Sequence, residues 1–178
     1  GKAALKLATT ASKNTAVGNA ALASNTTGFD NVAVGDLALD ANTTGNQNTA
    51  VGQECMTTNT TGVNNSAFGH RAAKLTTSGS SLVAIGQSAL EENTTGTSNV
   101  AVGVQALEGN TTADNNTAVG NAALKENTTG TANVAVGSGA LDASTTADNN
   151  TAVGYNALTV NTTGTQNTMC GSSAGDAN

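Results

Sequence analysis

The chain has 178 residues and a formal net charge of −6, with 10% charged and 2% aromatic residues, no Trp and no Pro. So few aromatic residues exclude an ordinary globular core, and the negative charge disfavours binding to nucleic acid or to an anionic membrane. No apolar run approaches the roughly 20 residues that a membrane-spanning helix needs, and the N-terminus lacks the apolar core of a signal peptide.

A unit of 17 residues fills the whole chain: Asn-Thr/Val-Ala-Val-Gly-x-x-Ala-Leu-x-x-Asn-Thr-Thr-Gly-x-x. Residues 1–13 are a partial copy, residues 14–166 hold full copies without insertion or deletion, and residues 167–178 are a second partial copy. An insertion would break the register of every stacked neighbour, so this constant period predicts a solenoid. We expect one all-β repeat domain over 1–178, cut from a longer fibre protein because it begins and ends in mid-unit.

The first segment of the unit, positions 2 to 4, alternates with a period of two residues, as in Val100-Ala101-Val102. This pattern predicts a short strand with one buried face. We expect position 4 to supply one core column and position 9 another. The predicted core columns are Val17, Val34, Val51, Phe68, Ile85, Val102, Val119, Val136 and Val153, and Leu22, Leu39, Met56, Leu90, Leu107, Leu124, Leu141 and Leu158.

Position 5, directly after this strand, is glycine in every copy. Either a backbone turn with positive φ or the close approach of another backbone explains the absence of a side chain. The predicted structural-turn residues are Gly18, Gly35, Gly52, Gly69, Gly86, Gly103, Gly120, Gly137, Gly154 and Gly171.

Positions 12 to 14, as in Asn25-Thr26-Thr27, predict a second short strand in each coil. Identical residues in register form ladders. The asparagine column from Asn25 is interrupted by Thr76 and Ser144. The predicted threonine ladder is Thr26, Thr43, Thr60, Thr77, Thr94, Thr111, Thr128, Thr145 and Thr162.

All charged residues fall at positions 6, 7, 10, 11, 16 or 17, which we therefore expect to face solvent as a variable rim. The copies that start at Asn65 and Leu82 depart most from the consensus. We expect a local widening or kink at these two copies.

Catalysis needs convergent titratable groups in a concavity. The one histidine, His70, lies at a variable rim position, and the pairs Glu91-Glu92 and Lys125-Glu126 lie on the same rim. We expect no enzyme activity, no catalytic or metal-binding residue and no cofactor. Asp114 and Asp148 follow corners with alanine in place of glycine, where corner hydrogen bonding fits better than an ion site.

The two cysteines, Cys55 and Cys170, are nearly seven units apart. At about 4.8 Å per coil they are roughly 30 Å apart, which excludes a disulfide within the chain. A single thin stack without disulfide or metal also buries little apolar surface against the entropy of ordering each coil. We therefore expect symmetric association of several chains.

The sequences Asn99-Val100-Ala101-Val102-Gly103 and Leu82-Val83-Ala84-Ile85-Gly86 resemble the Asn-Ser-Val-Ala-Ile-Gly signature of trimeric autotransporter adhesin (YadA-like) heads. The longer unit from Asn150 to Leu158, followed by Asn161-Thr162-Thr163-Gly164, is similar to repeats of phage tail-fibre proteins. The resemblance implies a left-handed parallel β-roll that associates as a homotrimer. A triple-wound β-helix stays open, because the unit is longer than the usual adhesin repeat.

By this resemblance, the chain is a non-enzymatic structural and receptor-presenting segment of a surface fibre used in host or surface attachment. The expected location is the virion surface or the extracellular face of a bacterial cell. Expected partners are two further copies of the chain and a host cell-surface carbohydrate or protein, with no nucleic acid and no membrane insertion.

Two other functions follow from the same pattern. The paired threonine columns that begin at Thr26 and Thr27 suggest an ice-binding β-solenoid, although adjacent residues of an extended strand point to opposite sides. Uncapped coil ends suggest a self-assembling extracellular filament subunit.

Overall fold

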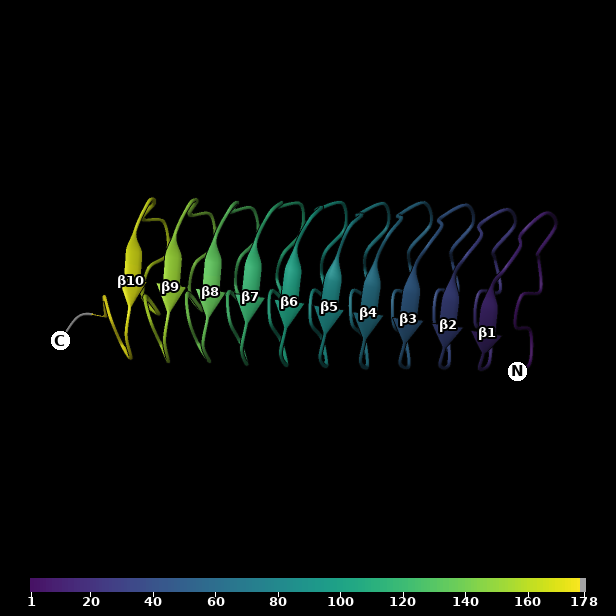
Figure 1. Ribbon diagram of the computed structural model, residues 1–178, viewed down its shortest axis with the longest axis horizontal. Helices are drawn as coiled ribbons and strands as arrows, with labels where there is room; N and C mark the ends of the chain where they lie inside the picture. Colours follow the sequence, from purple (N-terminus) through teal and green to yellow (C-terminus); the bar gives the residue numbers. More distant parts are fainter. Residues whose placement is uncertain (177–178) are drawn as a thin grey trace.

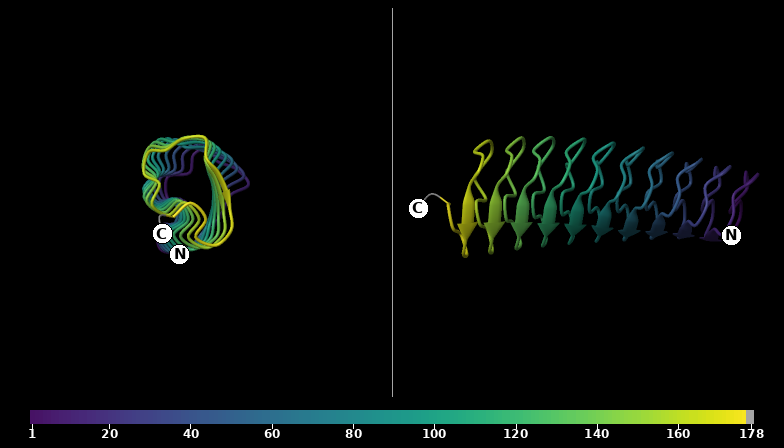
Figure 2. Two further views of the ribbon diagram at one scale, coloured as in Figure 1. Left: turned by 90° about the vertical axis from the view of Figure 1, so that its left-hand side faces the viewer. Right: turned by 45° about the horizontal axis from the view of Figure 1, so that its top comes forward.

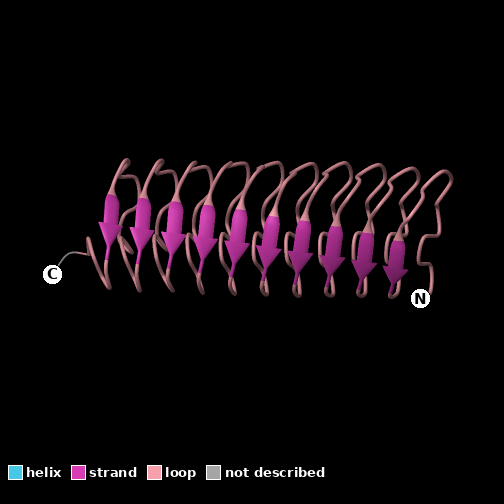
Figure 3. Ribbon diagram, in the orientation of Figure 1, coloured by secondary structure: helices cyan, strands magenta, loops and turns pink. Residues whose placement is uncertain are grey.

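The computed structural model of the chain describes residues 1–176. These residues contain ten three-residue strands and no helix (Figures 1 and 3). The strands lie side by side along a rod, with the two ends of the chain at opposite ends of the stack. They are β1 Thr15–Val17, β2 Val32–Val34, β3 Thr49–Val51, β4 Ser66–Phe68, β5 Val83–Ile85, β6 Val100–Val102, β7 Thr117–Val119, β8 Val134–Val136, β9 Thr151–Val153 and β10 Thr168–Cys170.

The ten strands form one parallel sheet in chain order, and each 17-residue unit makes one coil of a β-solenoid with about nine turns. Equivalent residues are paired, so that Val17 lies opposite Val34, and Val34 opposite Val51. Seen end-on, the coils share one outline, and each is displaced by a small, steady step from the one before (Figure 2). The pairing of β3, β4, β5 and β6 keeps this register. The sheet therefore passes through the two divergent copies without the break that a kink would produce.

Each coil contains one strand, so the second strand predicted at Asn25-Thr26-Thr27 is wrong. The backbone N–H groups of Thr26 and Thr27 both donate to the carbonyl oxygen of Thr43, at 3.0 and 3.2 Å. In a strand, successive amides point in opposite directions and cannot share one acceptor. Positions 12 to 15 therefore form a corner rather than a strand.

The apolar core is built from alanine at positions 3 and 8 and leucine at position 9. Ala33, Ala38 and Leu39 are fully buried, and the same pattern recurs along the rod. Adjacent residues such as Ala38 and Leu39 can both point inward because Leu39 has a left-handed φ of 52°, which breaks the alternation of an extended chain. The predicted leucine column therefore lies in the core, with Met56 taking one place in it.

The predicted core column at position 4 is wrong, because these side chains lie on the outer face of the sheet. Val17 is 56% exposed, Phe68 41% and Ile85 42%. Strand residues alternate between faces, so burying the alanine at position 3 turns positions 2 and 4 outward. We call this set the valine column: Val17, Val34, Val51, Phe68, Ile85, Val102, Val119, Val136 and Val153.

Residues other than glycine adopt the left-handed backbone conformation at positions 7, 9 and 17 of the coil. One coil shows the pattern in Gln105, Leu107 and Asn115, with φ of 58°, 52° and 62°. The amides of Gln105 and Asn115 donate to the preceding coil, and that of Leu107 donates to the following coil. Bonding to both neighbours thus holds conformations that L-residues ordinarily disfavour.

Candidate interaction surfaces

The glycine at position 5 satisfies both explanations that the sequence left open. Gly103 has a φ of 140°, a conformation that L side chains rarely adopt. A Cβ atom on Gly103 would also overlap the carbonyl group of Gly120 in the next coil. The same two conditions hold at position 5 of each coil from Gly18 to Gly154. The glycine column therefore fixes both the turn and the close spacing of the stack.

Two ladders of buried asparagine occupy the part of the coil interior away from the leucines. At position 12, Asn42 Nδ2 donates to Asn25 Oδ1 of the preceding coil at 3.0 Å and to Gly45 O of its own coil at 3.1 Å. At position 1, the Asn31 N–H donates to Asn14 Oδ1 at 2.9 Å, while Asn31 Nδ2 donates to Gly45 O at 2.9 Å. Sequence reasoning identified the first ladder and missed the second, although asparagine begins almost every copy.

Thr76 and Ser144 interrupt the position-12 ladder and leave buried acceptors without protein partners. Asn59 Oδ1 and Asn127 Oδ1 each precede one of these interruptions, and neither has a hydrogen-bond partner within residues 1–176. The Ser144 hydroxyl is also buried and unpaired in that part of the chain. The cause is chemical, because neither a threonine nor a serine side chain carries the amide N–H that continues the ladder.

The threonine ladder at position 13 bonds to the backbone of the chain itself. Thr26 Oγ1 donates to the Thr43 carbonyl at 3.1 Å, and the same bond recurs up to Thr145, whose Oγ1 lies 3.4 Å from Thr162 O. The hydroxyl donors of this column are therefore engaged within the solenoid.

The threonines at position 14 behave differently. They are exposed, and no hydrogen bond among the described residues involves their hydroxyl groups. We call this set the threonine edge: Thr27, Thr44, Thr61, Ser78, Thr95, Thr112, Thr129, Thr146 and Thr163.

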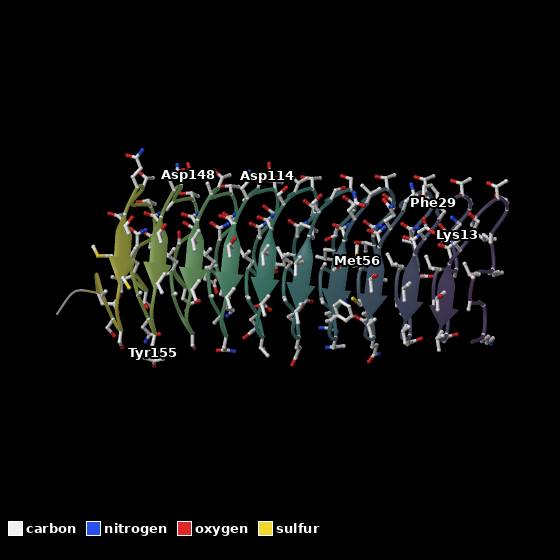
Figure 4. All side chains as sticks on the ribbon, in the orientation of Figure 1. Lys13, Phe29, Met56, Asp114, Asp148 and Tyr155 are labelled. Carbon is white, nitrogen blue, oxygen red and sulfur yellow. The ribbon has the colours of Figure 1, made fainter. Side chains whose placement is uncertain are left out.

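Asp114 and Asp148 accept hydrogen bonds at the corners of the coils, as expected. Asp114 Oδ1 lies 2.6 Å from Thr97 N and 2.9 Å from Thr97 Oγ1, and Asp148 makes the same pair of contacts with Thr131. Both carboxylates lie along the same edge of the rod, opposite Tyr155 (Figure 4). In earlier coils, Asn46 Oδ1 and Ser80 Oγ accept the equivalent backbone N–H. The acceptor thus recurs in every second coil.

The charged rim holds two small groups of ion pairs, one around Glu54 and one in which Lys125 Nζ lies 3.4 Å from Glu126 and 4.0 Å from Glu108. Glu54 lies 2.7 Å from Lys74 Nζ and 3.1 Å from Arg71 Nε. The hydrogen bond from Lys74, with a further contribution from Arg71, lowers the pKa of Glu54. Asp40 and Asp142 form no ion pair within residues 1–176, and burial raises the pKa of both carboxyl groups, against a smaller opposing effect of Lys125 on Asp142.

The histidine, cysteine and acidic side chains do not converge on one site within residues 1–176. His70 is exposed, and residues 1–176 form no pocket and no group of three or more His, Cys, Asp or Glu side chains that could hold a metal ion. Cys55 and Cys170 are both free. Burial raises the pKa of the Cys55 thiol to about 12, whereas Cys170 is exposed at the end of the sheet.

No protein-family model, curated protein or solved structure matches the chain. Residues 1–176 contain no helix of the length and apolar character that crossing a membrane requires. Any functional conclusion therefore depends on the solenoid and its surfaces.

Proposed function

We propose that the chain is a rigid, non-enzymatic segment of a homotrimeric surface fibre, of the kind found in phage tail fibres or bacterial adhesin heads. In this proposal three copies wind with the left-handed sense that the resemblance to adhesin heads implies, and the fibre lies on a virion or on the outside of a cell. Its role is to space and present binding residues toward a host or another surface.

The observation that carries the proposal is the unbroken register of the stack. Every strand from β1 to β10 pairs with its neighbour at the same 17-residue offset. Backbone bonds, asparagine amides and threonine hydroxyls tie each coil to the next at several points around its circumference. Bending the rod would require these bonds to lengthen together, and therefore the stack favours stiffness over hinge motion.

The variable rim is where recognition is expected. Position 6 changes from Asn121 to Ser138 to Tyr155 in successive coils, while the buried alanines and the buried leucine of these coils stay the same. Tyr155 is 60% exposed and projects from one edge of the rod (Figure 4). Variable polar and aromatic side chains on a rigid scaffold are typical of surfaces that bind carbohydrate or protein.

The proposal is tested by light scattering coupled to size-exclusion chromatography, followed by small-angle X-ray scattering. We expect a molar mass three times the 17.2 kDa of one chain and the scattering of a rod about 50 Å long, since about ten coils stack at roughly 4.8 Å each. A mass of one chain at every concentration, or the scattering of a compact sphere, would refute it.

A further inference from the structure

The valine column is restricted although its side chains are exposed or half-buried on the outer face of the sheet. Position 6 lies on the surface of the same coils and holds Asn, Asp, Gln, His, Val, Ser and Tyr in different copies. Position 4 holds only valine, isoleucine or phenylalanine from Val17 to Val153. A position whose side chain meets only water has no reason to exclude polar residues. The restriction therefore points to a contact made outside the coil.

Strand propensity does not account for this restriction. Threonine favours strands as valine does, because both are β-branched. Position 2 lies on the same outer face and accepts both residues, as in Thr117 and Val134. Position 4 accepts no threonine in any copy. What position 4 excludes is the hydroxyl group, so the contact it makes is apolar.

The threonine edge is a second restricted and exposed column. It holds threonine in every full copy except for Ser78, yet its hydroxyls bond to nothing among residues 1–176. None of the charged residues of the chain lies in the valine column or on the threonine edge. Most charged residues lie instead at positions 6, 7, 10 and 11 of the coil.

The partner of these columns must repeat with the spacing of the coils. Each coil presents the same side chains about 4.8 Å further along the rod, over a strip about 40 Å long. A folded protein of ordinary shape would meet at most a few coils and would leave the others free to vary. A second copy of this chain, aligned in the same direction, offers an equivalent apolar residue to every coil.

We propose that the valine column and the threonine edge pack against the same columns of neighbouring copies, with the coils in axial register. This inference rests on the proposed trimeric fibre and assigns its interface to the outer face of the sheet and to the corner that carries the threonine edge. Packing this face would cover an apolar strip longer than soluble monomers ordinarily expose. It would also leave the charged rim facing outward on every copy.

A matched pair of substitutions in one coil tests the assignment. Val119→Asp and Asn121→Asp introduce the same carboxylate two residues apart, the first in the valine column and the second on the rim. We expect Val119→Asp to convert the trimer to single chains that retain the circular dichroism of β-structure, and Asn121→Asp to retain the mass of the wild type. A trimeric Val119→Asp variant would overturn the inference and leave the trimer proposal intact, whereas a monomeric wild type would refute the proposed function itself.

Thiol labelling gives a second readout that does not require dissociation. In a Cys170→Val background, Val119→Cys, Thr112→Cys and Asn121→Cys are labelled with a maleimide, while the buried Cys55 stays unreactive. We expect labelling at positions 119 and 112 to be at least about tenfold slower than at 121, and equal at all three in urea. Equal rates in the native trimer would contradict the interface. Thermal hysteresis from a monomeric wild type would also overturn it, by showing that the repeating partner is ice.

Discussion

Buried asparagine side chains tie successive coils together, and at position 12 they do so through amide-to-amide bonds. The ladder at position 12 loses a bond where Ser144 follows Asn127, since Asn127 Oδ1 and the shorter Ser144 hydroxyl both lack a hydrogen-bond partner within residues 1–176. A buried acceptor without a partner costs about as much as the hydrogen bond it forgoes. Neighbouring coils with asparagine, such as Asn110 and Asn127 joined at 3.0 Å, show the geometry that a complete ladder adopts.

We expect Ser144→Asn to stabilise the fold by about 1 kcal/mol, because the new amide would donate to Asn127 Oδ1. The gain would be measured as a shift of the urea midpoint at matched protein concentration. Ser144→Ala is the control, since it changes the same position and supplies no donor. Equal midpoints for the two variants would contradict the ladder explanation.

Asp142 provides a prediction about pH. Burial raises the pKa of its carboxyl group, with a smaller opposing effect of Lys125 and a smaller reinforcing effect of Glu126. A folded-state pKa above the unfolded value means that the protonated form favours folding. This contribution is complete below the unfolded pKa and is lost as the pH rises through the folded pKa.

We therefore expect Asp142→Asn to raise the melting temperature at pH 7, where the wild-type carboxylate is ionised. The advantage should shrink as the pH falls and vanish near pH 3, where the wild-type carboxyl group is protonated. Calorimetry of both proteins over this range measures the difference. An advantage that is constant with pH would show that desolvation of the charge is not its cause.

At the scale of the coil, corners with left-handed residues and the glycine column set the shape. Gly103 meets the next coil so closely that a methyl group at this position would overlap the Gly120 carbonyl. Gly109 in the same coil has more room, since a Cβ atom on it would lie 3.0 Å from Lys125 O, and other copies carry Ala41 and Ala143 at this position.

We expect Gly103→Ala to destabilise the fold by about 2–4 kcal/mol through strain at a positive φ and overlap with the next coil. Gly109→Ala, the same chemical change in the same coil, should alter stability by less than about 0.5 kcal/mol. Chemical denaturation of both variants makes the comparison. A similar loss in the two would mean that the position-5 glycine is not needed for the turn.

Position 17 lies at an exposed corner, and there an alanine adopts the left-handed backbone conformation. Replacing this alanine by glycine should therefore have the opposite effect to Gly103→Ala. Ala132 has a φ of 57° and is exposed, so glycine would relieve its strain without removing a core contact. We expect Ala132→Gly to stabilise the fold by about 0.5–1 kcal/mol, after the greater freedom of glycine in the unfolded chain is subtracted. An unchanged or lower midpoint of denaturation would contradict the left-handed assignment.

The coil period, the turn at Gly103 and the inward leucine such as Leu107 could be predicted from the sequence, because each repeats in a pattern with one physical explanation. The face of the strand that is buried could not be predicted in this way. Val-Ala-Val fits either face of a sheet, and hydrophobicity alone favours burying valine. The leucine column fills the coil interior and leaves alanine as the inward residue of the strand. The left-handed conformations were equally hidden, because residues such as Gln105 and Leu107 do not favour them and only bonds to both neighbouring coils impose them.

At the scale of the whole molecule, stability depends on keeping every column in register. The side chains that accept hydrogen bonds at the corners recur in every second coil, and they add a longer period of two coils to the stack. Thr97 pairs with Asp114, and Thr131 pairs with Asp148. Deleting two units, residues 99–132, would bring Thr97 under Asp148 and preserve this alternation. Deleting the one unit 116–132 would instead place Asp114 next to Asp148.

We expect the two-unit deletion to fold with a melting temperature close to that of the wild type and a rod shorter by about 10 Å. The one-unit deletion should fold with lower stability, because two carboxylates would meet at one corner. A deletion of 25 residues, which breaks the register, should not fold. Circular dichroism and X-ray scattering of the three proteins measure these outcomes, and a folded 25-residue deletion would contradict the solenoid register.

The alanine side of each strand faces the coil interior, and in our proposal the valine side faces another copy of the chain. A crystal structure of the assembled protein tests this arrangement most directly. We predict Ala50, Ala67 and Ala84 stacked inside one chain, and Val51, Phe68 and Ile85 in contact with the same residues of neighbouring copies. Coordinates with these three larger side chains inside their own coil, or facing solvent in every copy, would contradict the account.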